Sequence, residues 1–220
     1  MKQFTDIQNV KTDENTSGFN PGDFIEITEK IDGVNASVAF DRETGKLTAF
    51  SKKHELSAGK TLRGFWNFVQ NVNENSCLFQ LIKNNPSFVL FGEWDIDNNK
   101  IKDYNVKYRK QWIVYDIWDS DRKCWLDHSA VRAFCNQAGI PYIHVLYIGP
   151  FISWDHCKSF LHANTYGPTQ EGIVIKNEDR IFENKNNELV PSVLQIINPE
   201  FTKDVSGQSQ KSFGGEPEIV

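Results

Sequence analysis

No stretch of the sequence stays apolar over the roughly 20 residues that a membrane-spanning helix needs, and the N-terminus lacks the apolar segment of a secretory signal. The four cysteines include no C-x-x-C pair and no spacing typical of a zinc site, so we expect reduced thiols. These absences predict a cytoplasmic protein that makes no contact with a membrane.

Common phosphate- and metal-binding motifs are also missing. The sequence has no G-x-x-x-x-G-K-[ST] motif, so a P-loop mechanism is not supported. The histidines show neither H-x-x-x-H spacing nor an acid at the spacing of a metalloprotease. We therefore interpret all five as surface or helix-capping residues: His54, His128, His144, His156 and His162.

The chain has no excess of basic residues. It carries 24 Lys and Arg against 29 Asp and Glu, a net charge of −5, which argues against binding nucleic acid over the whole surface. The most basic segment, residues 100–110, has five cations against one acid, with Tyr104 and Tyr108 between them. It is either a solvated loop or a contact for a phosphate backbone.

Aromatic residues are abundant: the sequence contains 16 Phe, 6 Trp and 6 Tyr but only one Met. This composition favours a stiff mixed α/β core. With 220 residues, the chain can form one large domain or two intimate lobes. We expect this domain to span residues 1–201, with a polar lead-in over residues 1–23 outside the core. Residues 202–220 lack apolar periodicity and predict a flexible tail.

Apolar periodicity predicts a mixed order of strands and helices. Three- and four-residue spacing predicts two helices, or one broken helix, over residues 63–84. Asp127 or Ser129 as a cap and Gly139 as a stop predict a helix over about residues 129–138, and Ser153 begins another over residues 154–163. Strands are predicted over residues 24–30, 34–41, 46–51, 88–94, 112–118, 145–148, 172–176 and 193–197.

One lysine stands out because an acid-glycine turn comes directly after it. Lys30 ends the first predicted strand and precedes the turn Asp32-Gly33. An amine on a rigid strand beside a glycine, where backbone can approach a ligand closely, has the setting of a nucleophilic lysine. The motif alone is a weak signal, because an exposed lysine before an Asp-Gly hairpin turn has the same pattern.

Four further stretches come after Lys30 in a fixed order: Ser51-Lys52-Lys53, Phe91-Gly92-Glu93-Trp94, Tyr115-Asp116-Ile117 and Glu171-Gly172-Ile173-Val174-Ile175-Lys176. Together they resemble the motifs of the covalent nucleotidyltransferases, which comprise polynucleotide ligases and capping guanylyltransferases. The resemblance covers residues 24–201. It implies an α/β (α+β) nucleotidyltransferase domain, similar to ATP-grasp proteins, in which antiparallel sheets flanked by helices surround a nucleotide cleft.

In detail the sequence resembles the RNA ligase family, in particular its nick-sealing, RNA ligase 2-like branch. Asn35 stands where DNA ligases usually carry an arginine, and residues 196–201 are similar to the end of that family's domain. No segment of OB-fold length comes after them. The resemblance implies an ATP-dependent ligase that forms lysyl-AMP, adenylates a 5′-phosphate RNA end and seals it to a 3′-OH. It also implies Mg²⁺ or Mn²⁺, RNA ends at a nicked duplex or a broken hairpin, and a separate RNA-binding or repair protein as partner.

The resemblance assigns the main chemical roles to three residues. Lys30 would carry AMP, Glu93 would hold the ribose hydroxyls, and Glu171 would bind the metal or orient the nucleophile. Carboxylates suit both tasks because Mg²⁺ prefers oxygen ligands. A salt-bridged strand carboxylate is the structural alternative for each acid.

Other residues are expected around the nucleotide. Tyr115 would stack on adenine and Val174 would cover its other face, although Tyr115 could equally be an ordinary core residue. Asn35 would contact a hydroxyl or a phosphate, or else cap the hairpin. The remaining expected contacts are Lys52 or Lys53 at a phosphate, and Glu29, Ile31 and Asp32 beside the lysine.

The final motif departs from the family. It usually supplies a lysine to the α-phosphate, but Gln195 and Ile197 stand at the corresponding positions. Losing a fixed cation slows the reaction unless Lys176 or Lys185 substitutes, so we count Lys176 with the catalytic residues and Gln195 with the nucleotide contacts. Three alternatives stay open: a minimal ATP-dependent DNA ligase, a degenerate nucleotide- or RNA-end-binding module without turnover, and, less favoured, a guanylyltransferase.

Overall fold

The computed structural model describes residues 4, 7–10, 18–94, 111–163, 166–167, 170–183 and 186–201. The predicted basic segment at residues 100–110, Lys185 and the predicted tail at residues 202–220 lie outside the described residues.

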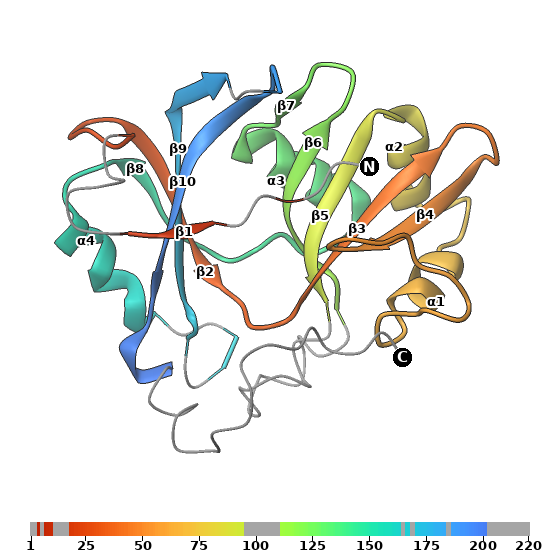
Figure 1. The fold of residues 1–220 in the computed structure, drawn as a ribbon, viewed down its shortest axis with the longest axis horizontal. Coiled ribbons are helices and arrows are strands. Elements are labelled where there is room, and N and C mark those ends of the chain that lie inside the picture. The colour runs from red at the N-terminus through yellow and green to blue at the C-terminus, as the bar shows by residue number, and fades with distance from the viewer. Residues whose placement is uncertain are drawn as a thin grey trace.

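The described strands form one ten-stranded sheet with the order β4-β3-β5-β6-β7-β10-β9-β2-β8, and β1 pairs with β10 (Figure 1). All neighbouring strands are antiparallel except β1 with β10 and β7 with β10. The bounds are β1 (Gln8–Asn9), β2 (Phe24–Lys30), β3 (Val34–Asp41), β4 (Lys46–Ser51), β5 (Phe88–Trp94), β6 (Ile113–Asp119), β7 (Cys124–Trp125), β8 (Val145–Pro150), β9 (Gly172–Glu183) and β10 (Leu189–Ile197).

The sheet has two halves, which Figure 1 shows side by side: β8, β2, β9 and β10 on the left, and β6, β5, β3 and β4 on the right. Only the two-residue strand β7 links them by strand pairing among the described residues, with two pairs to β6 and one to β10. We expected separate antiparallel sheets; the described strands instead form a single sheet, because this short strand bridges the halves.

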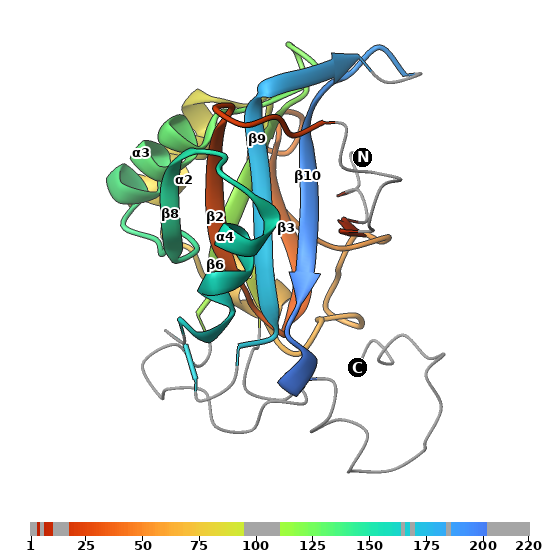
Figure 2. The ribbon, with the colours of Figure 1, turned by 90° about the vertical axis from the view of Figure 1, so that its left-hand side faces the viewer.

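Helices cover the right half. These are α1 (Phe65–Gln70), α2 (Cys77–Asn84) and α3 (His128–Ala138). In Figure 2, α2 and α3 lie on the side of the strands away from β10. The predicted break between the first two helices is confirmed, and α3 begins after Asp127, whose carboxylate accepts from the Ala130 backbone, and ends at Gly139 in a left-handed conformation.

The second predicted helix region is shorter than expected. Helix α4 (Trp154–Lys158) begins at its Ser153 cap but changes to a 3-10 turn, η2 (Ser159–His162). It packs beside the left half, where it covers a core that contains Cys157 and Leu161. None of the described helices is both long and apolar enough to cross a bilayer.

Alternation along β2 and β9 decides which side chains face the core of the left half. Ile25 and Ile27 of β2, and Ile173 and Ile175 of β9, are fully buried in that core. Because neighbouring side chains on a strand point to opposite faces, the residues between them face the other way, towards the right half. Glu26, Thr28 and Lys30 lie on this second face and line a cavity.

The predicted lead-in is partly wrong. Phe19 is buried in the left-hand core, and β1 pairs with β10. Phe4 packs on Phe91 and Tyr115, with ring centroids 5.5 and 4.9 Å away. Such short segments carry no periodicity, so only their partners elsewhere in the chain reveal that they belong to the fold.

Candidate active site

A cavity of about 500 Å³ lies between the two halves of the sheet. One wall comes from β2, β9 and β10, and the other from β3, β5 and β6. All but one of the residues predicted for the site line it: Glu29, Lys30, Ile31, Asn35, Lys52, Glu93, Tyr115, Glu171, Val174, Lys176 and Gln195. Asp32 does not line the cavity, but its charge is close enough to raise the pKa of Glu93.

Strand register orders the first wall into three rungs. Lys30 pairs with Gly172, Thr28 with Val174, and Glu26 with Lys176. On the other side of β9, Gly172 pairs with Ile197, Val174 with Gln195, and Lys176 with Val193. Successive rungs are roughly 7 Å apart, because each covers two strand residues. The cavity therefore runs from a lysine rung, through a valine rung, to a third rung with charged residues.

At the lysine rung, Nζ of Lys30 lies 2.8 Å from Oε1 of Glu171. Strands β9 and β10 lie close together at this rung because Gly172 has no side chain. A Cβ on Gly172 would lie 2.2 Å from the Ile196 carbonyl oxygen. Glycine thus lets β9 and β10 approach beside the lysine and hold Glu171 against it.

Gly33 brings a second carboxyl group to this end of the cavity. A Cβ on Gly33 would lie 2.5 Å from Cγ of Glu93, so the turn after Lys30 allows Glu93 to approach. Gly33 is not in a left-handed conformation, so the glycine serves close packing and not an unusual turn. Burial raises the pKa of Glu93 to about 8, although the Lys30 charge opposes this. Glu93 is therefore mostly protonated at neutral pH.

Asn35 and Glu93 are paired residues on β3 and β5. Nδ2 of Asn35 donates to the hydroxyl of Tyr115, while its Oδ1 is buried and accepts no hydrogen bond in the described part of the chain. Asn35 thus fixes the Tyr115 ring and keeps an acceptor for a ligand. Together with Val174 on the opposite wall, Tyr115 forms an apolar middle section of the cavity.

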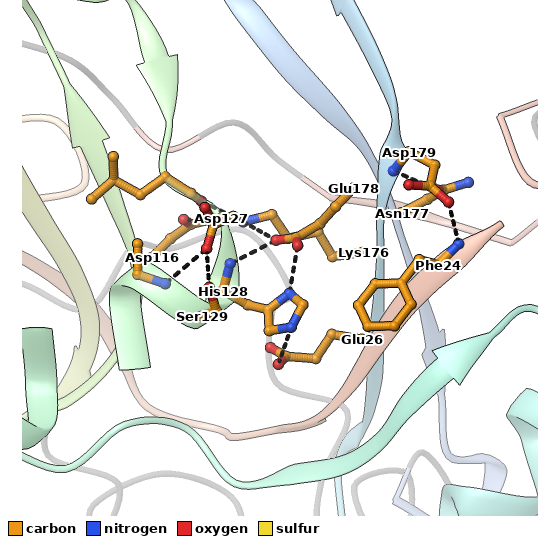
Figure 3. Close-up of polar contacts among 12 residues, drawn as sticks. Phe24, Glu26, Asp116, Asp127, His128, Ser129, Lys176, Asn177, Glu178 and Asp179 are labelled. Atoms are coloured by element: carbon orange, nitrogen blue, oxygen red, sulfur yellow. Dashed lines mark hydrogen bonds and ion pairs between the residues drawn. The ribbon is translucent and has the colours of Figure 1, made fainter. Parts of the chain in front are cut away.

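The third rung carries a charged network that Figure 3 shows. Nζ of Lys176 lies 3.3 Å from both carboxylate oxygens of Asp116 and 3.3 Å from the Leu126 carbonyl oxygen. Lys176 therefore lines the cavity, but it is two rungs away from Lys30 and paired with Asp116. This geometry does not favour the predicted contact between Lys176 and the α-phosphate.

His128, at the start of α3, joins the same network. Its backbone N–H donates to Oε1 of Glu178 at 2.6 Å, and its Nδ1 lies 2.6 Å from Oε2 of that residue. Its Nε2 lies 3.7 Å from Oε2 of Glu26. His128 is 4% exposed, so its interpretation as a surface residue was wrong. The nearby carboxylates, above all Glu178, raise the pKa of His128.

Sequence reasoning missed several residues of the cavity. Apart from Asp116, which stands in the Tyr115-Asp116-Ile117 stretch, none of them belongs to a motif, because their partners come from other strands and helices. They are Phe4, Ile7, Glu26, Thr28, Asp116 as a lining residue, Tyr142, Ile143 and Val193. The only available signal was an acid, Glu26, inside the apolar alternation of a predicted strand.

The described residues contain no group of three or more His, Cys, Asp or Glu side chains arranged to hold a metal. Mg²⁺ is usually bound by one or two carboxylates together with phosphate oxygens and water. Glu171, with an oxygen donor beside the lysine in a cavity open to a ligand, fits that kind of site.

A model of the RNA ligase family matches residues 23–192. The match covers most of the chain, so the chain belongs to the RNA ligase family. No curated protein sequence matches it.

Solved structures with the same fold include ligases. An archaeal ATP-dependent RNA ligase, form 2, is 16% identical, with a TM-score of 0.62 over 88% of this chain and 48% of that chain. A mutant of the Naegleria gruberi RNA ligase with ATP and Mn is 17% identical, with a TM-score of 0.66 over 94% and 59%. A putative ATP-dependent DNA ligase from Aquifex aeolicus is 17% identical, with a TM-score of 0.54 over 88% and 50%.

The chain thus spans between about half and three fifths of the length of these structures. At such low identity the similarity shows the fold: a mixed α/β structure with a large sheet and few helices, similar to the nucleotidyltransferase folds of ligases.

Proposed function

We propose that the chain is an ATP-dependent RNA ligase that forms a covalent lysyl-AMP intermediate on Lys30. The observation that carries this proposal is the 2.8 Å contact between Nζ of Lys30 and Glu171, at one end of a nucleotide-sized cavity. Membership of the RNA ligase family supports the same activity. ATP as the nucleotide is supported by structural neighbours described as ATP-dependent or solved with ATP.

In the first step, Nζ of Lys30 attacks the α-phosphorus of ATP. The bond between the α-phosphorus and the bridging oxygen breaks, and pyrophosphate leaves with that bonding pair. The lysine must lose a proton to become a nucleophile, and the adjacent Glu171 carboxylate is within hydrogen-bond distance to accept it. Lysyl-AMP then passes AMP to a 5′-phosphate end, and the 3′-OH of a second end displaces AMP to form a phosphodiester.

The layout of the cavity suits the three parts of a nucleotide. The phosphates would lie at the lysine rung with Lys52 nearby, and the ribose beside Glu93 and Asn35. A protonated Glu93 can both donate to and accept from a ribose hydroxyl. The base would lie between Tyr115 and Val174, where apolar surface covers its faces.

Glu171 would hold a divalent cation together with phosphate oxygens of ATP. Such an ion would neutralise charge on the departing pyrophosphate. Mn is present with ATP in the Naegleria gruberi neighbour, which supports this part of the proposal.

The final motif supplies no lysine to the lysine rung. Ile197 faces the cavity on the same rung as Lys30, and Gln195 lies one rung further, beside Val174. The second candidate function, a nucleotide- or RNA-end-binding module without turnover, is favoured by this absence of a cation at Ile197 and Gln195.

RNA ends, at a nicked duplex or a broken hairpin, are the proposed substrates, because of the family and of Asn35 in the lysine motif. A separate RNA-binding or repair protein is the proposed partner.

Incubation of the purified protein with labelled ATP and Mg²⁺ tests the proposal. The protein should gain the mass of one AMP, through an acid-labile and base-stable bond, and Lys30→Ala and Lys30→Arg should gain none. Absence of the adduct with Mg²⁺ and with Mn²⁺ would favour the binding module. An adduct formed with GTP instead would favour capping chemistry.

A further inference from the structure

The far end of the cavity is polar, and two of its residues, Glu26 and Tyr142, belong to no sequence motif. Glu26, Asp116, Tyr142 and Lys176 line this end, beyond the apolar section formed by Tyr115 and Val174. A base held in the apolar section, with its phosphates at Lys30, turns its outer edge towards these residues. This end is therefore where the cavity can distinguish one base from another.

Asp116 and Lys176 use most of their hydrogen-bonding capacity on each other. Both carboxylate oxygens of Asp116 lie 3.3 Å from Nζ of Lys176, and Oδ1 also accepts from the Ile117 backbone N–H. Lys176 donates in addition to the Leu126 carbonyl oxygen. These two residues thus make their hydrogen bonds within the protein and have little capacity left for a ligand.

Glu26 is different. It is 2% exposed, and its Oε1 accepts from the Tyr142 hydroxyl at 2.6 Å. Its Oε2 is buried and accepts no hydrogen bond from the residues that the structure describes; His128 Nε2, at 3.7 Å, is beyond hydrogen-bond distance. A carboxylate offers about four lone-pair positions, so Glu26 keeps acceptor capacity beside the cavity.

An acceptor buried without a hydrogen bond is unfavourable, and a ligand that brings a donor removes this penalty. Adenine carries a 6-amino group, a donor, on the edge that would face Glu26. Guanine carries a 6-oxo group there, and two acceptors facing each other repel.

We propose that the Glu26 carboxylate reads the base of the nucleotide by accepting a hydrogen bond from the adenine 6-amino group. The inference rests on the proposed function for the position of the phosphates. Tyr142 and His128 hold Glu26 in place: Tyr142 by its hydrogen bond, and His128 through its Nε2, 3.7 Å from Oε2 of Glu26, on a ring whose Nδ1 contacts Glu178. Glu26 is thus a specificity residue, two rungs away from the nucleophile.

The test measures binding in a Lys30→Ala background, in which no AMP transfer can occur. Calorimetry compares ATP with purine riboside triphosphate, which lacks only the 6-amino group. With Glu26 present, loss of this group should weaken binding about tenfold or more, as expected when a buried acceptor is left without its hydrogen bond. With Glu26→Leu, the two ligands should bind equally within about twofold.

Glu183→Gln is the matched control, because Glu183 is exposed at the end of β9 and does not line the cavity. It should keep the tenfold preference for ATP. Glu26→Gln is a second, isosteric variant: its amide can turn an N–H towards a 6-oxo group, so the preference for ATP over GTP should fall at least severalfold. Circular dichroism verifies that each variant is folded.

An equal loss of affinity on removing the 6-amino group, with and without Glu26, would overturn the proposal. So would an unchanged ratio of ATP to GTP affinity in Glu26→Gln, or no nucleotide binding at all. The proposed function fails separately: if the unmodified protein forms no AMP adduct but shows the Glu26-dependent preference, base reading stands and the chain is a binding module.

Discussion

Two neighbouring residues hold Lys30, Glu171 through its side chain and Gly172 through its backbone. Nζ of Lys30 lies 2.8 Å from Oε1 of Glu171, and Gly172 is the strand partner of Lys30. The nucleophile and its carboxylate are thus fixed to each other by two adjacent strands. A positioned carboxylate that accepts a proton in the transition state typically raises the reaction rate 10²–10⁴-fold.

Glu171→Gln should therefore slow lysyl-AMP formation by roughly 10²-fold or more. The amide keeps the shape of the side chain but cannot accept the proton from the lysine. Single-turnover formation of the adduct at saturating ATP measures the rate. Glu183→Gln, an exposed position at the far end of the strand that follows Glu171, is the control. A rate within about twofold of the unmodified protein would exclude Glu171 as the proton acceptor.

Stability should depend on pH through Glu93. Burial raises its pKa from 4.5 to about 8, so between these values the folded protein binds a proton that the unfolded chain does not. The contribution of Glu93 to stability is therefore fully present below about pH 4.5 and is lost as the pH rises through about 8. Glu93→Gln, which mimics the protonated acid, should remove this dependence.

The measurement is the thermal unfolding midpoint between pH 5 and pH 9 without nucleotide. The difference between the two proteins isolates Glu93 from other titrating groups, and Glu93→Gln should gain in relative stability as the pH rises. Glu43→Gln, on an exposed turn, should run parallel to the unmodified protein. Parallel curves for Glu93→Gln as well would contradict the raised pKa.

The missing cation predicts a gain of function. Ile197→Lys places an amine on the rung of Lys30, so it should accelerate adenylation more than Gln195→Lys, which lies one rung further. An increase on the order of tenfold is expected for Ile197→Lys if its ammonium reaches the α-phosphate. Single-turnover rates at saturating ATP compare the two variants.

Lys176→Ala tests whether Lys176 replaces the lysine that the final motif lacks or whether the site works without that charge. Since Lys176 pairs with Asp116 two rungs away, its loss should weaken nucleotide binding more than it lowers the rate at saturation. A fall of orders of magnitude in the saturated rate, with no gain from Ile197→Lys, would instead make Lys176 the substitute cation.

Polymer choice gives a further test. Sealing should require ribose on at least the 3′-OH side of the break, as the proposed RNA ligase activity implies. Ligation assays with matched nicks, all-DNA or with a single 3′ ribonucleotide, measure the preference. Equal rates on both substrates would move the protein towards the DNA ligase alternative.

Local pattern was sufficient to predict most elements of the fold. Alternation placed β2, β3, β4 and β5 within a residue of their observed bounds, and the predicted cap, Asp127 or Ser129, together with the stop at Gly139 placed α3 within a residue of its bounds. β9 and β10 were predicted too short, because their outer ends lose the apolar alternation. β1 and β7, two residues each, are too short for any periodicity to mark them.

The site was predictable where a motif existed and not elsewhere. Lys30, Glu93 and Glu171 were grouped by their order in the sequence, and they do line one cavity. Glu26 and His128 meet only because α3 begins beside β2, and no spacing in the sequence encodes such a contact. A histidine held between two carboxylates can be recognised only after folding has brought them together.

Because β2 pairs with β9, the active site can form only late in biosynthesis. Lys30 is translated early, whereas its strand partner Gly172 and the adjacent Glu171 come from the far end of the described chain. At ordinary translation speeds, this interval is on the order of ten seconds. During that time β2 exposes Ile25 and Ile27 without the partners that bury them. The nascent chain therefore carries its nucleophile well before it can use it, and the same long-range pairing that builds the site leaves a hydrophobic strand edge exposed to association with other chains.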